Sequence, residues 1–112
     1  MKHTKEEIEK EVKKILADTE RSYIENMPFK IELVKDLKDL FLKKSIANGW
    51  DVTVFVKEDQ FPDKDEYSAI IIIFNDDTGE IESYRDMSCG RPVPMIAFKN
   101  NKGKYELGLQ RK

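Results

Sequence analysis

Two groups of side chains in this sequence could take part in chemistry, and the larger group is a run of carboxylates. Asp59, Asp63, Asp65 and Glu66 could gather around a divalent cation, because such ions prefer oxygen ligands. A run of this kind is more often a solvated loop, so we predict no metal. Its charges suit a basic protein surface instead, and a stiff loop around Arg91 offers an exposed cation. The predicted partner-binding residues are Glu58, Asp59, Asp63, Asp65, Glu66 and Arg91.

The second group is the one cysteine and the one histidine of the chain. Cys89 would need an activating base, and His3 precedes the first predicted helix, in a segment that we expect to be frayed. A single thiol and a single imidazole cannot build a metal site of the zinc type. The five glycines are isolated from one another, so no glycine-rich phosphate loop is present. We therefore predict no catalytic residue, no cofactor and no enzymatic activity.

Charge is distributed unevenly along the chain although the formal net charge is only -2. Residues 51–86 carry 11 acidic and three basic side chains, whereas residues 87–112 carry one acidic and six basic ones. The near-neutral total argues against the broad positive field of non-specific nucleic-acid binding. An alternative keeps that function for the basic C-terminal hairpin, with Phe98 and Tyr105 as stacking side chains.

The elements that must position these residues begin with a helix. Thr4 and Glu7 form a capping box, and apolar residues recur at helical spacing from Ile8 onward, which predicts a helix from Lys5 to about Glu25. Residues 28–49 allow two interpretations. Phe29, Ile31 and Leu33 alternate as in a strand, followed by a helix capped by Asp36, whereas a stripe at Ile31, Val34 and Leu37 favours helix throughout. We favour the second interpretation, and both end a helix at Gly49.

After Gly49 the apolar period changes to two, which indicates antiparallel strands. Strands are predicted at 52–56, 67–74, 80–85, 95–98 and 104–110, with a hairpin turn at 75–79. The predicted fold is α+β, with two N-terminal helices packed on a mainly antiparallel sheet of four to five strands. It forms one domain over residues 1–112, helical over about 4–49 and sheet over about 50–112.

One strand of this sheet is apolar on both faces, from Ile70 to Phe74. A sheet with a solvated back would alternate here. We therefore expect a cover on the second face, which is a second helix, a curled sheet enclosing a cavity, or another chain. Pro94 should lie at a strand start or on an edge.

These observations favour a small non-enzymatic protein-binding module, of the inhibitor or immunity type, that engages a basic partner through its acidic loop. The alternative is a small-ligand domain or weakly marked enzyme whose cavity is lined by Trp50, Phe55, Tyr67 and Tyr84. No stretch reaches the ~20 apolar residues of a membrane span, and no secretory signal opens the chain, so we expect a cytoplasmic protein. The sequence also allows a second copy of the chain as the partner, in a homodimer.

Overall fold

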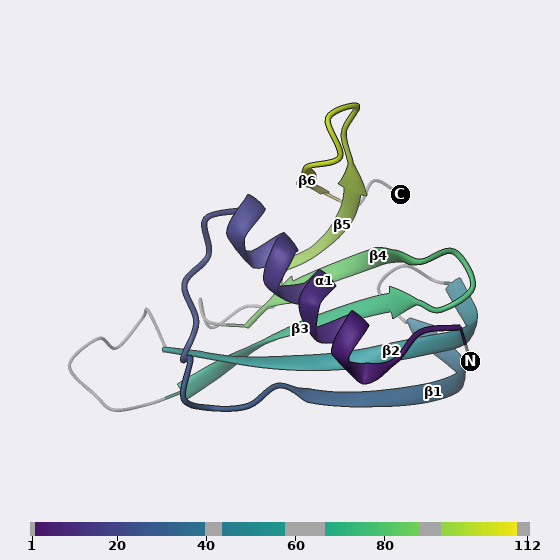
Figure 1. Cartoon of the computed structure of the whole chain (residues 1–112), viewed down its shortest axis with the longest axis horizontal. Helices are drawn as coiled ribbons and strands as arrows, with labels where there is room; N and C mark the ends of the chain where they lie inside the picture. Colours follow the sequence, from purple (N-terminus) through teal and green to yellow (C-terminus); the bar gives the residue numbers. More distant parts are fainter. Residues whose placement is uncertain (1, 40–43, 58–66, 88–92, 110–112) are drawn as a thin grey trace.

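The computed structural model describes residues 2–39, 44–57, 67–87 and 93–109, which form one helix and a six-stranded antiparallel sheet. The α+β class is confirmed. The strands follow one another across the sheet in chain order, so β1 and β6 are its two edges (Figure 1). The elements are α1 (Lys5–Asp18), β1 (Lys30–Asp39), β2 (Lys44–Lys57), β3 (Tyr67–Asn75), β4 (Glu80–Asp86), β5 (Val93–Lys99) and β6 (Tyr105–Leu109).

The predicted second helix is wrong, because residues 30–57 form the β1–β2 hairpin. The stripe that favoured a helix is divided between two faces of the sheet. Ile31 packs in the core under α1, whereas Val34 and Leu37 pack in a separate cluster on the other face. Gly49 lies within β2 rather than at a helix end. The helical part is therefore residues 5–18 rather than 4–49, and the sheet has six strands rather than four or five.

Helix α1 starts as predicted and ends earlier than predicted. The Thr4 hydroxyl accepts the Glu7 amide at 3.2 Å, and the Glu7 carboxylate accepts the Thr4 amide at 3.2 Å. The helix ends at Asp18 because the Thr19 hydroxyl donates to the Ile15 carbonyl and Glu20 adopts a φ of 56°. A left-handed residue directly after a helix is a common stop. Residues 19–29 then cross to β1.

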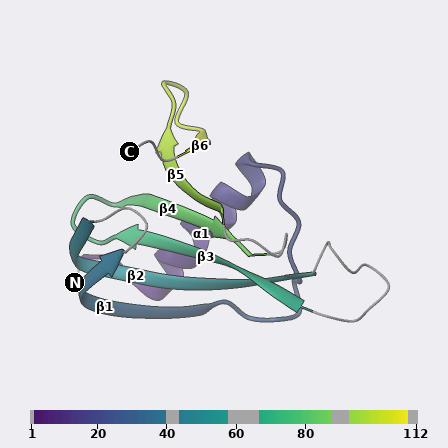
Figure 2. The ribbon, with the colours of Figure 1, turned by 180° about the vertical axis from the view of Figure 1, so that it is seen from behind.

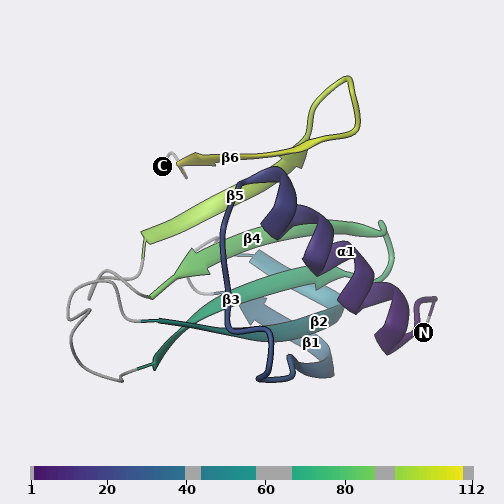
Figure 3. The same ribbon diagram turned by 60° about the vertical axis from the view of Figure 1, so that its left-hand side comes forward.

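The main core lies between α1 and one face of the sheet. Four apolar residues of α1, at spacings of three or four, are buried against valines, isoleucines and aromatics of β2, β3 and β4. The helix crosses the strands obliquely, from β1 near its N-terminus to β6 near its C-terminus (Figure 3). In the described ranges there is no helix that is long and apolar enough to span a bilayer. The fully buried helix residues are Ile8, Val12, Ile15 and Leu16.

The second face is covered at one end by the sheet itself. Leu37 and Ile46, near the end of the β1–β2 hairpin, bury Ile73, with Val34 and Ile71 packed beside them (Figure 2). Gly49 permits this bend, since a Cβ there would lie 2.9 Å from Leu37 Cδ1. The two-sided apolar run is thus explained in part by a curled sheet. Ile72 is fully buried under α1, whereas Ile71 is only half-buried on the other face.

Smaller predictions about turns and strand ends are confirmed. Gly79 in the β3–β4 turn has a φ of 76°, which favours glycine, and Asn75 binds two amides of that turn. Pro94 is the second residue of β5 and lies opposite Arg85, before the β5–β6 pairing begins at Met95. A proline at the start of a strand leaves the ladder intact.

Candidate functional site

The six predicted partner-binding residues lie outside the described residues: Glu58, Asp59, Asp63, Asp65, Glu66 and Arg91. Cys89 lies outside them too. The structure does describe the strand ends to which their segments are joined. Lys57, the last residue of β2, pairs with Tyr67, the first of β3. Asp86, the last residue of β4, pairs with Val93, the first of β5. Both connections leave the sheet at the same end, because all these strands are antiparallel neighbours.

We use the term open face for the side of the sheet that α1 does not cover, beyond the reach of the β1–β2 hairpin. Alternation along the strands places on it the residues that lie between buried core positions. All the large apolar side chains that are exposed in the described ranges lie on this face, namely Tyr67 (59% exposed), Phe98 (47%) and Ile96 (37%). The other members are Lys30, Glu32, Asp51, Thr53, Phe55, Lys57, Ala69, Ile71, Arg85 and Glu106.

Two carboxylates face each other directly across strands β1 and β2 on this face. Glu32 and Asp51 are register partners, and like charges in this arrangement destabilise a sheet. Partial burial raises the pKa of the Asp51 carboxyl above its ordinary value, and the Glu32 charge raises it further, while Arg85 opposes both effects. The pair therefore represents a local electrostatic cost within the fold, which a cation placed over it would relieve.

Another carboxylate, that of Asp76, is buried near the N-terminal end of α1. Asp76, only 1% exposed in the β3–β4 turn, accepts the Trp50 indole N–H at 2.9 Å. It also accepts the backbone amides of Lys2 at 2.7 Å and His3 at 3.0 Å, and the His3 Nδ1 at 3.1 Å. Burial alone would raise the pKa of Asp76, but these hydrogen bonds outweigh it and lower the pKa to about 2. His3 is thus held on the sheet rather than frayed.

The C-terminal half of α1 is tied to β5 and β6 by another polar cluster. The Tyr105 hydroxyl donates to Glu11, and Lys99 Nζ lies 3.0 Å from the same carboxylate. Asp18 accepts the Tyr105 amide at 3.0 Å and pairs with Lys14 at 2.8 Å. Burial and the Glu11 charge raise the pKa of the Tyr105 phenol. Since Tyr105 is 1% exposed, it offers no free ring for stacking on a nucleic-acid base.

A third cluster fixes the crossover between α1 and β1. Arg21 Nε lies 3.1 Å from Asp86 Oδ2, so the crossover is tied to the end of β4. Burial raises the pKa of the neighbouring Tyr84 phenol to about 12, with a further contribution from the Asp86 charge. These three clusters share one chemical role, which is to hold α1 and its flanking segments on the sheet.

A groove of about 650 Å³ lies beside edge strand β1. It is lined by Thr4, Lys5 and Glu6 at the start of α1, and by Ile31, Glu32, Leu33 and Trp50 of the sheet. The four aromatic residues predicted to line one cavity do not meet. Trp50 and Tyr84 lie in the core under α1, whereas Phe55 and Tyr67 belong to the open face.

Within the described ranges, no group of three or more His, Cys, Asp or Glu side chains is placed to hold a metal ion. Sequence reasoning missed the polar contacts of His3 with Asp76, and it missed the facing carboxylates Glu32 and Asp51. If residues 30–39 had been predicted as a strand paired with residues 44–57, the sequence would have indicated that Glu32 and Asp51 lie on the same face. Comparison of the chain with models of protein families, with curated proteins and with solved structures finds no match in any of the three.

Proposed function

We propose that this chain is a non-enzymatic protein-binding module whose partner docks on the open face of the sheet. The observation that supports this most is that Tyr67, Ile96 and Phe98, the exposed large apolar side chains of the described ranges, all lie on this one face. Ile96 and Phe98 are neighbours on β5, whereas Tyr67 lies at the start of β3. Exposed apolar side chains on one face of a sheet are typical of interaction surfaces. Tyrosine and phenylalanine are also enriched in the buried centres of such interfaces.

The β1–β2 part of the same face favours a cationic group of the partner, and Lys30, Lys57 and Arg85 of the face lie around it. The facing carboxylates Glu32 and Asp51 repel each other in the free protein, and a lysine or arginine from the partner would relieve that repulsion. The acidic segment 58–66 joins Lys57 to Tyr67, at one end of the face. A basic partner would therefore meet negative charge at two places. Long-range attraction of this kind speeds association more than it slows dissociation.

A chain that covers a basic surface of another protein acts as an inhibitor or an immunity-type factor if that surface is an active site or a substrate-binding site. The Arg91 segment leaves the sheet at the same end as the acidic segment, so both belong to the proposed contact. The proposed contact residues are those predicted from the sequence, Glu58, Asp59, Asp63, Asp65, Glu66 and Arg91, together with the open face.

Affinity capture from the source cells tests this proposal with three baits. The first is the wild-type chain, the second carries Ile96→Asn and Phe98→Asn on the open face, and the third carries Ala17→Asn and Ser22→Asn on the helix side. We expect a protein that the first and third baits retain and the second loses at least tenfold. Equal retention by all three baits would exclude the open face as the interface.

The role of charge is tested with two variants of equal net charge. One reverses Asp59, Asp63, Asp65 and Glu66 to Lys. The other reverses Glu6 and Glu9 of α1, Glu20 after it, and Glu80 at the opposite end of the sheet from the acidic segment. We expect the first variant to associate with the captured partner at least tenfold more slowly, and the second to change the rate less than threefold. Similar rates for both variants would mean that only overall charge matters.

A second candidate function rests on the groove beside β1. Its volume of about 650 Å³ and its apolar wall of Ile31, Leu33 and Trp50 suit a small apolar ligand. A thermal-shift screen with small apolar compounds tests it on the wild-type chain and on Leu33→Asn. A compound that stabilises the first and leaves the second unchanged would support a ligand site.

A further inference from the structure

The hydrogen bonds of Asp76 join three segments that are distant in the chain: the N-terminal residues Lys2 and His3, Trp50 in β2, and the β3–β4 turn. Three of the four donors to its carboxylate belong to Lys2 and His3, and the fourth is the Trp50 indole of β2. The His3 ring also meets Phe74 edge-to-face, with ring centroids 5.2 Å apart. Figure 1 shows the N-terminal segment beside the β3–β4 turn that carries Asp76. The segment before α1 is therefore held by one buried carboxylate and one aromatic contact.

Little else holds this segment on the sheet. Lys2 and residues 4–7 are exposed, and the first residue of α1 that enters the core is Ile8. Beyond Ile8 the helix has its own anchors, through its apolar stripe and through the bonds of Glu11 and Asp18 with Tyr105. Segments with few buried contacts open locally at a free energy well below that of global unfolding. The residues before Ile8 can thus leave the sheet while the rest of the helix stays docked.

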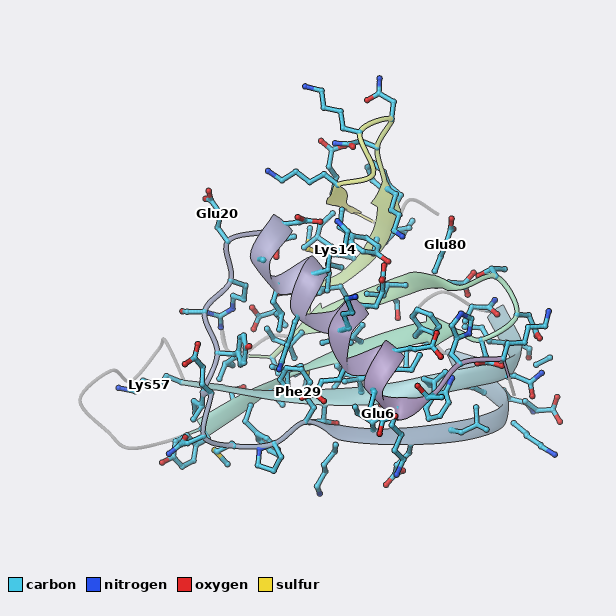
Figure 4. All side chains as sticks on the ribbon, in the orientation of Figure 1. Glu6, Lys14, Glu20, Phe29, Lys57 and Glu80 are labelled. Carbon is cyan, nitrogen blue, oxygen red and sulfur yellow. The ribbon has the colours of Figure 1, made fainter. Side chains whose placement is uncertain are left out.

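The same residues form one wall of the groove beside β1. Thr4, Lys5 and Glu6 face Ile31, Leu33 and Trp50 across it. Figure 4 shows Glu6 at the first turn of the helix, on the side of β1. Because the opposite wall belongs to the rigid sheet, the width of the groove depends on where this first turn lies.

We propose that the contact of the Lys2–His3 segment with Asp76 is a latch, and that its release moves the first turn of α1 away and opens the groove over Trp50. Asp76 is the fixed part, because it lies in a glycine-containing turn held by two bonds to Asn75. The N-terminal segment is the moving part. In the closed state Trp50 is 2% exposed, whereas Ile31 and Leu33 beside it are half-buried, so the latch shields the Trp50 part of the groove from solvent.

Trp50 is the only tryptophan of the chain, so its fluorescence reports on this groove alone. Two variants release the latch in different ways: His3→Ala removes the ring, and Asp76→Asn removes the charge and one acceptor oxygen. The matched control is Asp77→Asn, the exposed neighbour in the same turn. We expect quenching of Trp50 by acrylamide to increase at least threefold in both latch variants and less than 1.3-fold in the control.

Amide hydrogen exchange separates a latch from a general loss of stability. A latch predicts that the amides of Lys2 and His3, which donate to Asp76, exchange at least tenfold faster in His3→Ala. The amides of Val52 and Ile72 in the sheet should stay protected up to the free energy of global unfolding that urea gives for the same variant. Exchange of these sheet amides faster than that free energy allows would overturn the proposal, since the sheet would then open together with the segment. Unchanged shielding of Trp50 in His3→Ala would overturn it too, and this variant decides if Asp76→Asn does not fold.

Discussion

Asp76→Asn should make the protein less stable at neutral pH and leave its stability almost unchanged at pH 2. The carboxylate is 1% exposed and accepts hydrogen bonds from Lys2, His3 and Trp50. These bonds lower its pKa from 3.8 to about 2 in the folded protein. A carboxyl whose pKa is lower when folded stabilises the fold above its unfolded pKa, and this contribution is lost as pH falls through the folded pKa.

The size of this contribution follows from the two pKa values. Their difference of about 1.8 corresponds to about 2 kcal/mol, at ~1.4 kcal/mol for each pKa unit. The contribution should therefore be complete above pH ~5 and absent below pH ~2. Asparagine keeps the size of the side chain and one acceptor for the Trp50 indole, so the comparison removes the charge with little change in packing.

Urea unfolding of the wild type and of Asp76→Asn at several pH values between 2 and 7 measures this. We expect the difference in unfolding free energy to be about 2 kcal/mol at pH 7 and below 1 kcal/mol at pH 2. Taking the difference between the two proteins cancels the titration of other carboxyls, including Glu11 and Asp18, whose pKa values are also lowered in the fold. A difference that does not depend on pH would mean that lost packing, and not charge, weakens the variant.

Three further predictions concern the other polar sites. Asp51→Asn should raise stability by about 0.2–1 kcal/mol at pH 7, because it removes the repulsion by Glu32. Since the pKa of Asp51 is raised in the fold, this gain should shrink in thermal melts as pH falls and the folded carboxyl takes up a proton. Tyr105→Phe should cost about 1.5 kcal/mol in urea unfolding, because Glu11 loses a charge-assisted hydrogen bond, and no loss would mean that the bond is absent in solution. Thr4→Ala should cost about 0.5–2 kcal/mol through loss of the cap, and an unchanged midpoint would place the helix start further along the chain.

The parts of the fold that the sequence predicted well depend on neighbours in the chain. The capping box joins residues three apart, and the β3–β4 turn depends on Asn75 and Gly79. The two-residue period after Gly49 was also a sufficient signal for the later strands. Contacts of this range follow from local geometry, so a single sequence contains the information needed to predict them.

The prediction of a second helix was wrong because the apolar residues that suggested it belong to two separate hydrophobic clusters. Ile31, Val34 and Leu37 have helical spacing, yet the hairpin bends so that Ile31 enters the main core and the other two pack on the opposite face. Asp36, which resembled a helix cap, has a φ of 53° inside β1 instead. A bend that changes which face is buried breaks the two-residue alternation. Periodicity then favours a helix where a strand is present.

The polar sites were harder to predict than the fold because they join residues far apart in the chain. The bond from the His3 amide to Asp76 spans 73 positions, and the facing pair Glu32 and Asp51 depends on the register of a hairpin that the prediction lacked. Composition did indicate an acidic region between residues 51 and 86. It did not distinguish Asp76, which is buried and structural, from Asp51, which lies on the open face.

The apolar run Ile70–Phe74 connects the fold with the proposed function. Its residues alternate between the core under α1 and the opposite face, and on that face the cover is incomplete. The β1–β2 hairpin reaches far enough to bury Ile73 to 3% exposure, whereas Ile71, two residues earlier in β3, stays only half-buried. The same strand therefore supplies a closed core, a small second core and the start of the open face. Toward Tyr67 the sheet has apolar surface that the described residues do not cover, and burying such surface against a second protein would be favourable by about 25 cal/mol for each Å².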